Sequence, residues 1–193
     1  HAIDHPANLY GTSKFGNEQI AAAYHNIHGL KSVGLRFFTV YGPWGRPDMA
    51  VSLFTNKIEN GETITLFNGG EMWRDFTFVD DIVQGIELSM EYCSDNAAVF
   101  NLGNSKPVKL GYFLEQIEKR LGIKAKFKYQ ASNAEIKETY ADVSKAHELL
   151  GYQPTTSIES VLDQFMAWYK KLDKRTRDEW AGGRFKAGRV RRR

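Results

Sequence analysis

Tyr10 and Lys14 are the residues of this chain whose types and spacing could perform proton transfer. They stand four positions apart in residues 9–14, which read LYGTSK. On a helix, side chains at this spacing share one face, with their Cβ atoms about 5–6 Å apart. A phenol with a pKa near ~10 is a poor base at neutral pH, and a neighbouring ammonium favours its ionised form. The pair therefore suits a general base with its helper, or else an aromatic ring packed beside a solvated charge.

A helix must hold these two side chains together, and the flanking residues predict one. Pro6 and Asn8 supply a start signal, apolar residues recur at helical spacing as far as Ile27, and Gly29 is a natural terminator. We therefore predict a helix from Asn8 to His28.

Strands and helices alternate along the rest of the chain, which predicts an α/β fold with parallel strands. A densely apolar stretch at 32–40 is typical of a buried strand, and a loop rich in glycine and proline follows at 41–48. Further strands are expected at 63–67, 73–77, 99–102 and 125–129. Further helices are expected at 51–60, 80–93, 110–121, 142–150 and 156–172.

Two of these helices carry expected start signals. Asp142 should cap the helix that ends at Leu150, and Thr156 with Glu159 is a candidate capping box for the last helix.

The composition and charge exclude several classes of protein. Of 193 residues, 42% are hydrophobic and 25% charged, and no apolar run approaches the ~18 residues of a membrane span. Cys93 is the only cysteine, which excludes an internal disulfide and fits a reducing, cytoplasmic setting. The positive net charge comes from residues 182–193, which hold six basic residues and no acid. The body is mildly acidic, so neither a nucleic acid nor a membrane is an expected partner.

Three motifs, in order, give the chain a resemblance to a known family. They are YGTSK at residues 10–14, GLRFFTVYGPWGRPDMA at 34–50 and RDFTFVDD at 74–81. In these motifs the chain resembles the extended short-chain dehydrogenase/reductase family, and within it the nucleotide-sugar epimerases that act on UDP-glucuronate. The likeness runs from His5 to about Tyr169.

The resemblance implies the C-terminal part of a Rossmann-type parallel sheet interleaved with a small α/β substrate-binding lobe. It assigns residues 1–42 and 78–103 to the remnant of the Rossmann NAD-binding domain. Residues 43–77 and 104–173 would form the substrate-binding lobe. We expect residues 174–193 to be a basic, disordered tail.

In such enzymes the tyrosine takes a proton from the sugar 4-hydroxyl while C4 gives a hydride to NAD. The lysine binds the nicotinamide ribose and lowers the pKa of the tyrosine. The resemblance therefore implies that Tyr10 is the base, that Lys14 is its helper, and that both contact the cofactor. Phe38 would lie near the nicotinamide carboxamide. No metal ligand is implied.

The resemblance also implies a set of residues that bind the UDP-sugar substrate. Arg46 would hold the sugar carboxylate and Arg74 would clamp the pyrophosphate, roles that suit the fixed fork of a guanidinium. Phe67 would border the uracil. Thr39 stands where the glucuronate epimerases carry threonine and many relatives carry asparagine. The plain alternatives are that Phe38 and Phe67 are core residues and that the two arginines are solvated.

The sequence lacks much of the family's cofactor site. It contains no G-x-x-G-x-x-G motif, and the family's catalytic serine or threonine would stand upstream of its first residue, His1. We therefore expect the C-terminal part of an NAD-dependent UDP-sugar 4-epimerase whose N-terminal Rossmann half is missing, and we expect it to be inactive alone. Full-length relatives are implied to be homodimers built on a four-helix bundle. Only one of the two bundle helices is present, which argues against that dimer here.

Other interpretations stay open. The chain could derive from a galactose epimerase, a dehydratase or a decarboxylase of the same family. Competition between UDP-glucuronate and UDP-glucose as substrates would distinguish these from a glucuronate epimerase. It could be a non-catalytic nucleotide-sugar-binding module that kept the substrate lobe, which would bind UDP without NAD. The Arg-rich tail could dock on nucleic acid or on an anionic membrane, although the resemblance does not extend into it.

Overall fold

The computed structural model describes residues 6, 8–92, 97–131 and 137–181. Its helices are α1 (Leu9–His28), α2 (Ala50–Glu59), η1 (Asn68–Gly70), α3 (Val79–Met90), α4 (Leu110–Leu121), α5 (Ser144–Leu150), α6 (Ile158–Lys171) and α7 (Lys174–Ala181). Its strands are β1 (Val33–Phe37), β2 (Thr39–Tyr41), β3 (Thr63–Phe67), β4 (Trp73–Arg74), β5 (Phe76–Phe78), β6 (Ala98–Leu102), β7 (Val108–Lys109), β8 (Lys126–Gln130) and β9 (Glu138–Thr139). Within these residues no helix is long and apolar enough to cross a lipid bilayer.

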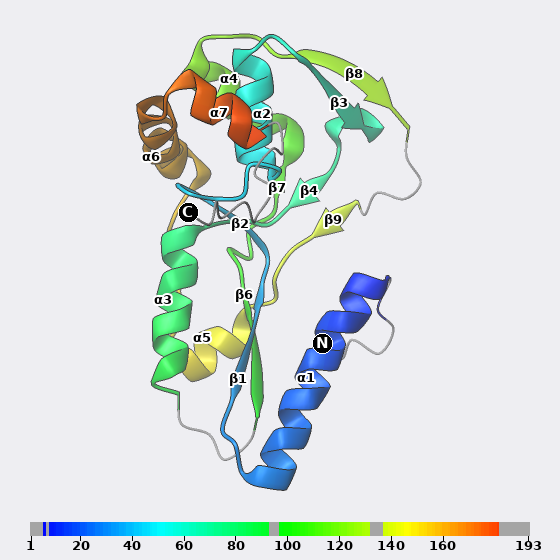
Figure 1. Cartoon of the computed structure of the whole chain (residues 1–193), viewed down its shortest axis with the longest axis vertical. Helices are drawn as coiled ribbons and strands as arrows, with labels where there is room; N and C mark the ends of the chain where they lie inside the picture. Colours follow the sequence, from blue (N-terminus) through cyan, green and yellow to red (C-terminus); the bar gives the residue numbers. More distant parts are fainter. Residues whose placement is uncertain (1–5, 7, 93–96, 132–136, 182–193) are drawn as a thin grey trace, which may run out of the picture.

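The elements gather into two parts (Figure 1). In the first, the parallel pair β1–β6 lies between α1 on one side and α3 with α5 on the other. In the second, α2, α4, α6 and α7 pack together near the parallel pair β3–β8. The parallel pair β2–β5 and the three-stranded arrangement β7–β4–β9 lie where the two parts meet. The fold is therefore mixed α/β with parallel strand pairs, as the alternation of strands and helices predicts.

The stretch at 32–40 forms two strands where the sequence predicts one. The chain pairs with β6 along β1 and then with β5 along β2, and the break falls at Phe38. The Phe38 N–H donates to the Leu102 carbonyl at 3.1 Å, which ends the pairing with β6. The expected strand at 73–77 divides in the same way at Asp75. In both places a change of pairing partner divides one expected strand into two.

Apolar side chains form two clusters, one for each part of the molecule. The larger joins β2, β5, α2, α4 and α6, and at its centre the Phe76 ring stacks on Phe113 with centroids 4.2 Å apart. The smaller joins α3, α5 and β6 around Leu102 and Tyr152, both fully buried. Helix α1 contributes no buried residue to either. It is tied to β1 by Arg36, which donates two hydrogen bonds of 2.6 Å to the Glu18 carboxylate.

Helix α1 begins and ends with local capping chemistry, and two other expected helix starts are corrected. The Asn8 side chain accepts from the Gly11 N–H, and Gly29 closes α1 with a φ of 66°, as predicted. Val143, not Asp142, is the N-cap of α5, and Asp142 Oδ1 accepts from the Ser144 N–H at 3.0 Å. The expected capping box at Thr156 is wrong, because Ser157 is the N-cap of α6 and accepts from the Ser160 N–H. Thr156 instead donates its N–H to the buried Asp81 carboxylate at 3.3 Å.

The expectation of a disordered tail is wrong for residues 174–181, which form α7. Arg177 makes the docking contacts: its guanidinium lies 5.2 Å from the centroid of the Tyr169 ring, and Nη1 donates to Glu59 Oε1 at 2.5 Å. Composition does not reveal this helix, because the residue that binds Arg177, Glu59, lies 118 positions earlier in the chain. Residues 182–193 lie outside the described residues.

Glu118 of α4 makes the stability of the fold sensitive to acid. Its side chain is 8% exposed and accepts hydrogen bonds from Lys124 Nζ and from the Ala125 N–H, both at 2.7 Å. Burial by itself raises the pKa of this carboxyl, but the two hydrogen bonds outweigh it and hold the pKa below its usual range. A lowered folded pKa stabilises the fold above the unfolded value of about 4.3, and the stabilisation is lost as pH falls through the folded pKa.

We expect Glu118→Gln to be about 1–3 kcal/mol less stable than the wild-type chain at neutral pH and to lose less stability on acidification. Urea unfolding followed from neutral pH down to about pH 3 measures both effects. Glu115→Gln is the matched control, since it removes an exposed carboxylate from the same helix. Parallel pH profiles for the two variants would contradict this account.

Candidate active site

Helix α1 places Tyr10 and Lys14 in contact at its N-terminal end. Lys14 Nζ lies 5.3 Å from the centroid of the Tyr10 ring, within the range of a cation–π interaction. Tyr10 is 71% exposed, so the phenol faces open space rather than a core. The predicted juxtaposition is therefore present, and the catalytic role of the pair stays a prediction.

Arg46 lies in the loop between β2 and α2, with its guanidinium forked on the carboxylate of Asp48. Arg46 Nε donates to Asp48 Oδ1 at 3.0 Å, and Nη2 donates to Oδ2. Both side chains are mainly exposed. The hydrogen bonds to Asp48 raise the pKa of Arg46, and the guanidinium holds the pKa of Asp48 below its usual range. Arg46 is therefore set in a geometry that receives a carboxylate with both arms of its fork.

Tyr10 and Arg46 belong to one electrostatic neighbourhood although they come from different elements. After Asp48, the Tyr10 phenol is among the groups that raise the pKa of Arg46. The Tyr10 phenol at the start of α1 therefore acts electrostatically on the guanidinium of Arg46 in the loop that follows β2. Sequence reasoning paired Tyr10 with Lys14, proposed Arg46 separately and did not anticipate Asp48, although an acid two positions after an arginine in a tight loop is a usable signal.

Phe38 and Thr39 lie where the chain stops pairing with β6 and begins to pair with β5. Both side chains are half-buried. Thr39 is in register with Phe76 of β5. Their predicted contacts with nicotinamide and substrate stay predictions.

Arg74 comes from β4, where the two parts of the molecule meet, and Phe67 comes from β3 of the second part. Arg74 Nη1 donates to the Trp73 carbonyl at 2.9 Å, and its Nη2 lies 3.6 Å from the sulfur of Met72. Phe67 ends β3 and packs, partly buried, against the larger apolar cluster. That contact explains Phe67 as a core residue. The proposed contacts of Arg74 with the pyrophosphate and of Phe67 with the uracil stay predictions.

Asp75 is an organising residue that sequence reasoning missed. It is 1% exposed, and its Oδ1 accepts from the Asn104 N–H at 2.8 Å and from the Thr77 hydroxyl at 3.1 Å. Its Oδ2 accepts from the N–H groups of Ser105 at 2.9 Å and Ala141 at 2.8 Å. A single carboxylate therefore ties the β4–β5 junction to the segments that follow β6 and β9. The sequence signal for this role is the position of Asp75, an acidic residue between Arg74 and the mainly apolar residues 76–79.

Gly103 fits beside this carboxylate because it has no side chain. A Cβ at this position would stand 2.4 Å from the Cβ of Ala141 and 2.8 Å from Asp75 Oδ2. The Gly103 carbonyl accepts from the Tyr152 hydroxyl at 3.0 Å, which fixes the smaller cluster to the same point.

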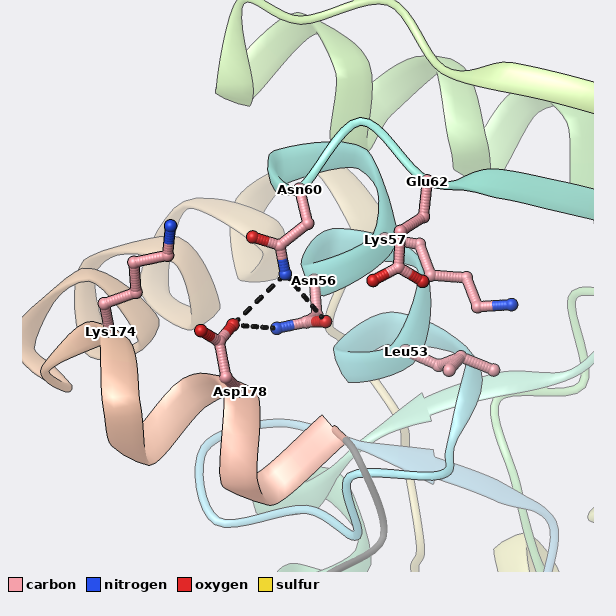
Figure 2. A pocket seen from close by; sticks show the side chains of 7 residues that line it. All are labelled: Leu53, Asn56, Lys57, Asn60, Glu62, Lys174 and Asp178. Atoms are coloured by element: carbon pink, nitrogen blue, oxygen red, sulfur yellow. Dashed lines mark hydrogen bonds between the residues drawn. The ribbon is translucent and has the colours of Figure 1, made fainter.

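A hollow of about 320 Å³ lies between α2 and α7, away from the predicted site residues. Figure 2 shows Asp178 of α7 facing Asn56 of α2 and Asn60, which follows that helix, across it. Asp178 Oδ1 accepts from Asn60 Nδ2 at 3.1 Å and from Asn56 Nδ2 at 3.4 Å. None of the residues proposed for catalysis or binding lines this hollow, so its polar groups serve the docking of α7.

Residues 1–103 match the NAD dependent epimerase/dehydratase family. Among curated relatives, UDP-glucuronate 4-epimerase 1 of Arabidopsis thaliana is 41% identical over 183 residues, which cover 86% of this chain and 43% of the relative. An uncharacterized protein of Methanocaldococcus jannaschii is 48% identical over 168 residues, covering 86% of this chain and 51% of that protein. The chain thus spans about half the length of the curated relatives it matches.

Solved structures give similar matches. UDP-glucuronic acid 4-epimerase from Bacillus cereus, solved with UDP-glucuronic acid and NAD, superposes with a TM-score of 0.81 at 32% identity, covering 90% of this chain and 57% of that one. UDP-glucose 4-epimerase from Thermotoga maritima, solved with UDP-glucose, superposes with a TM-score of 0.78 at 29% identity, covering 86% and 55%.

Proposed function

This chain belongs to the NAD dependent epimerase/dehydratase family, and from that premise we propose that it is the C-terminal part of a nucleotide-sugar epimerase that interconverts UDP-glucuronate and UDP-galacturonate at C4. The observation that carries the proposal is the guanidinium of Arg46, which already binds a carboxylate with both arms of its fork, in a chain where Lys14 lies over the ring of Tyr10. This arrangement pairs a proton-transfer group with a receptor for the acid of the sugar. The similarity to UDP-glucuronate epimerases along most of the chain supports the same substrate.

The chemistry of this chain's residues centres on one proton. Tyr10 takes the proton of the sugar 4-hydroxyl, with the Lys14 ammonium held over its ring. Tyr10, Lys14 and Phe38 would hold the nicotinamide end of NAD, which would supply the hydride chemistry at C4. Tyr10 then gives the proton back once the 4-keto sugar has presented its opposite face, which inverts C4.

Cofactor and substrate would meet this chain on its exposed residues. Tyr10 is largely exposed, with the Lys14 ammonium over its ring, so both are open to a nicotinamide ribose. Phe38 would border the nicotinamide. Arg46 would exchange the Asp48 carboxylate for that of the sugar, because a bidentate fork accepts either. Thr39, Phe67 and Arg74 would contact the rest of the UDP-sugar.

We propose further that the chain is inactive without an N-terminal Rossmann half. The relatives are about twice as long, and helix α1, which is without a buried residue, leaves apolar side chains exposed. The exposed ones are Leu9, Tyr10, Ile20, Tyr24 and Ile27. An upstream half that covered this face would supply the rest of the cofactor site.

Isothermal titration of the purified chain with UDP-glucuronate, UDP-glucose and NAD in turn tests the proposal. We expect UDP-glucuronate to bind more tightly than UDP-glucose, NAD to bind weakly or not at all, and no UDP-galacturonate to form. Equal affinity for the two sugar nucleotides, or a preference for UDP-glucose, would refute the substrate assignment. Turnover by the chain alone would refute the need for a second half.

A further inference from the structure

Trp44 occupies a backbone conformation that large side chains rarely adopt. The Gly45 N–H donates to the Gly42 carbonyl at 3.2 Å, which closes a turn with Pro43 second and Trp44 third. The φ of Trp44 is +62°. Proline at the second position with a positive φ at the third defines a type II turn, in which the third position favours glycine. A tryptophan persists there only when the surrounding structure holds it, and such outliers gather at ligand sites.

The contact that holds Trp44 comes from α6. Its ring lies 5.5 Å from that of Trp168, with the planes inclined at 63°, a favourable edge arrangement. Trp168 in turn contacts Phe165 at 5.6 Å, and Phe165 is fully buried in the larger cluster. Trp44 itself is 72% exposed, so the ring contact, not burial, accounts for its place.

The first residue of the same turn is fixed against the other part of the molecule. Gly42 has a φ of +148°, and a Cβ there would stand 2.7 Å from Val79 Cγ1 at the start of α3. The turn is therefore held by α3 at Gly42 and by α6 at Trp44. Arg46 follows immediately, and its carbonyl accepts from the Met49 N–H at 3.1 Å.

We propose that Trp44 is a positioning residue: through its contact with Trp168 it fixes the loop that presents Arg46, and so determines the preference of the site for a carboxylated sugar nucleotide. This inference rests on the proposed function for the role of Arg46. Trp44 acts through the loop and is not assigned a contact with the substrate.

The positioning role is tested first without any ligand, by amide hydrogen exchange on the whole chain. Glycine relieves the strain at a positive φ, so if Trp44 were merely tolerated, Trp44→Gly would leave exchange at Gly45 and Met49 unchanged or slower. We expect it to be faster by about three- to tenfold, since an aromatic contact of this kind is lost. Trp44→Phe should keep the wild-type rates. Unchanged or slower exchange in Trp44→Gly would overturn the proposal.

Ser105→Gly is the matched control, because Ser105 also has a positive φ, of +58°, and lies in the loop after β6. It removes a side chain at a strained position without touching Trp168, and exchange at Gly45 should not change.

The specificity role is tested by titrating the variants with UDP-glucuronate and UDP-glucose. We expect Trp44→Gly to reduce the preference for UDP-glucuronate severalfold, and Trp44→Phe and Ser105→Gly to retain it. If Trp44→Gly speeds amide exchange in the loop but keeps the preference for UDP-glucuronate, the specificity role alone is overturned. A wild-type chain without preference would refute the proposed function and this specificity role with it, while the exchange data would still decide whether Trp44 orders the loop.

Discussion

Asp75→Ala is expected to destabilise the chain by roughly 3–5 kcal/mol, a large part of the ~5–15 kcal/mol that holds a typical domain folded. The carboxylate is 1% exposed and accepts from the backbone N–H groups of Asn104, Ser105 and Ala141. Alanine leaves these groups without their acceptor, and each buried unsatisfied donor costs about 1–3 kcal/mol. The loss is structural, because it releases the segments after β6 and β9 from the β4–β5 junction.

Urea unfolding followed by circular dichroism measures this loss. Asp80→Ala is the matched control: it removes an exposed carboxylate from the first turn of α3 and should cost less than about 1 kcal/mol. Asp75→Asn keeps the shape but turns an amide donor toward backbone donors, so it should also be clearly destabilised. Equal unfolding midpoints for Asp75→Ala and Asp80→Ala would show that the buried carboxylate does not organise the fold.

Arg46→Met is expected to abolish the preference of the chain for UDP-glucuronate over UDP-glucose. Methionine keeps an unbranched side chain but cannot make the paired, charge-assisted hydrogen bonds that Arg46 now makes to Asp48. Affinity for UDP-glucuronate should fall by about tenfold or more, while affinity for UDP-glucose should hardly change. Titration of the variant with both ligands measures the ratio.

Asp48→Asn is expected to change the affinity for UDP-glucuronate in the opposite direction, by raising it. It removes the charged partner that occupies the fork of Arg46, so the sugar carboxylate no longer competes with an ion pair and binding should tighten. Arg46→Lys keeps the charge without the planar fork and should fall between the wild type and methionine. An unchanged ratio in Arg46→Met would exclude Arg46 as the receptor of the carboxylate.

The sequence by itself determined those elements whose signals lie within a few residues of one another. Helix α1 begins after Asn8 and ends before Gly29 because a side-chain cap and a left-handed glycine act locally. Helix α4 and strand β3 also have the predicted bounds, since each has a clear periodicity. The contact of Tyr10 with Lys14 follows from the spacing of one helix turn. The ordered motifs likewise indicated the family.

Tertiary structure decided the features that depend on partners far along the chain. The runs at 32–40 and 73–77 divide where their pairing partner changes, which no local pattern records. The expected tail contains α7 because Arg177 meets Glu59, and the start of α6 shifts to Ser157 while Asp81 binds the Thr156 N–H.

The same division runs through the candidate site. The types of its residues could be proposed from motifs, but the fork of Arg46 on Asp48 and the contact of Trp44 with Trp168 required the folded chain. Asp75 gives the physical reason most plainly: its four hydrogen-bond partners come from three segments of the chain. Local sequence determines those elements whose signals are local. Buried polar groups, in contrast, need hydrogen-bond partners from distant segments, and only the packed structure shows which segments supply them.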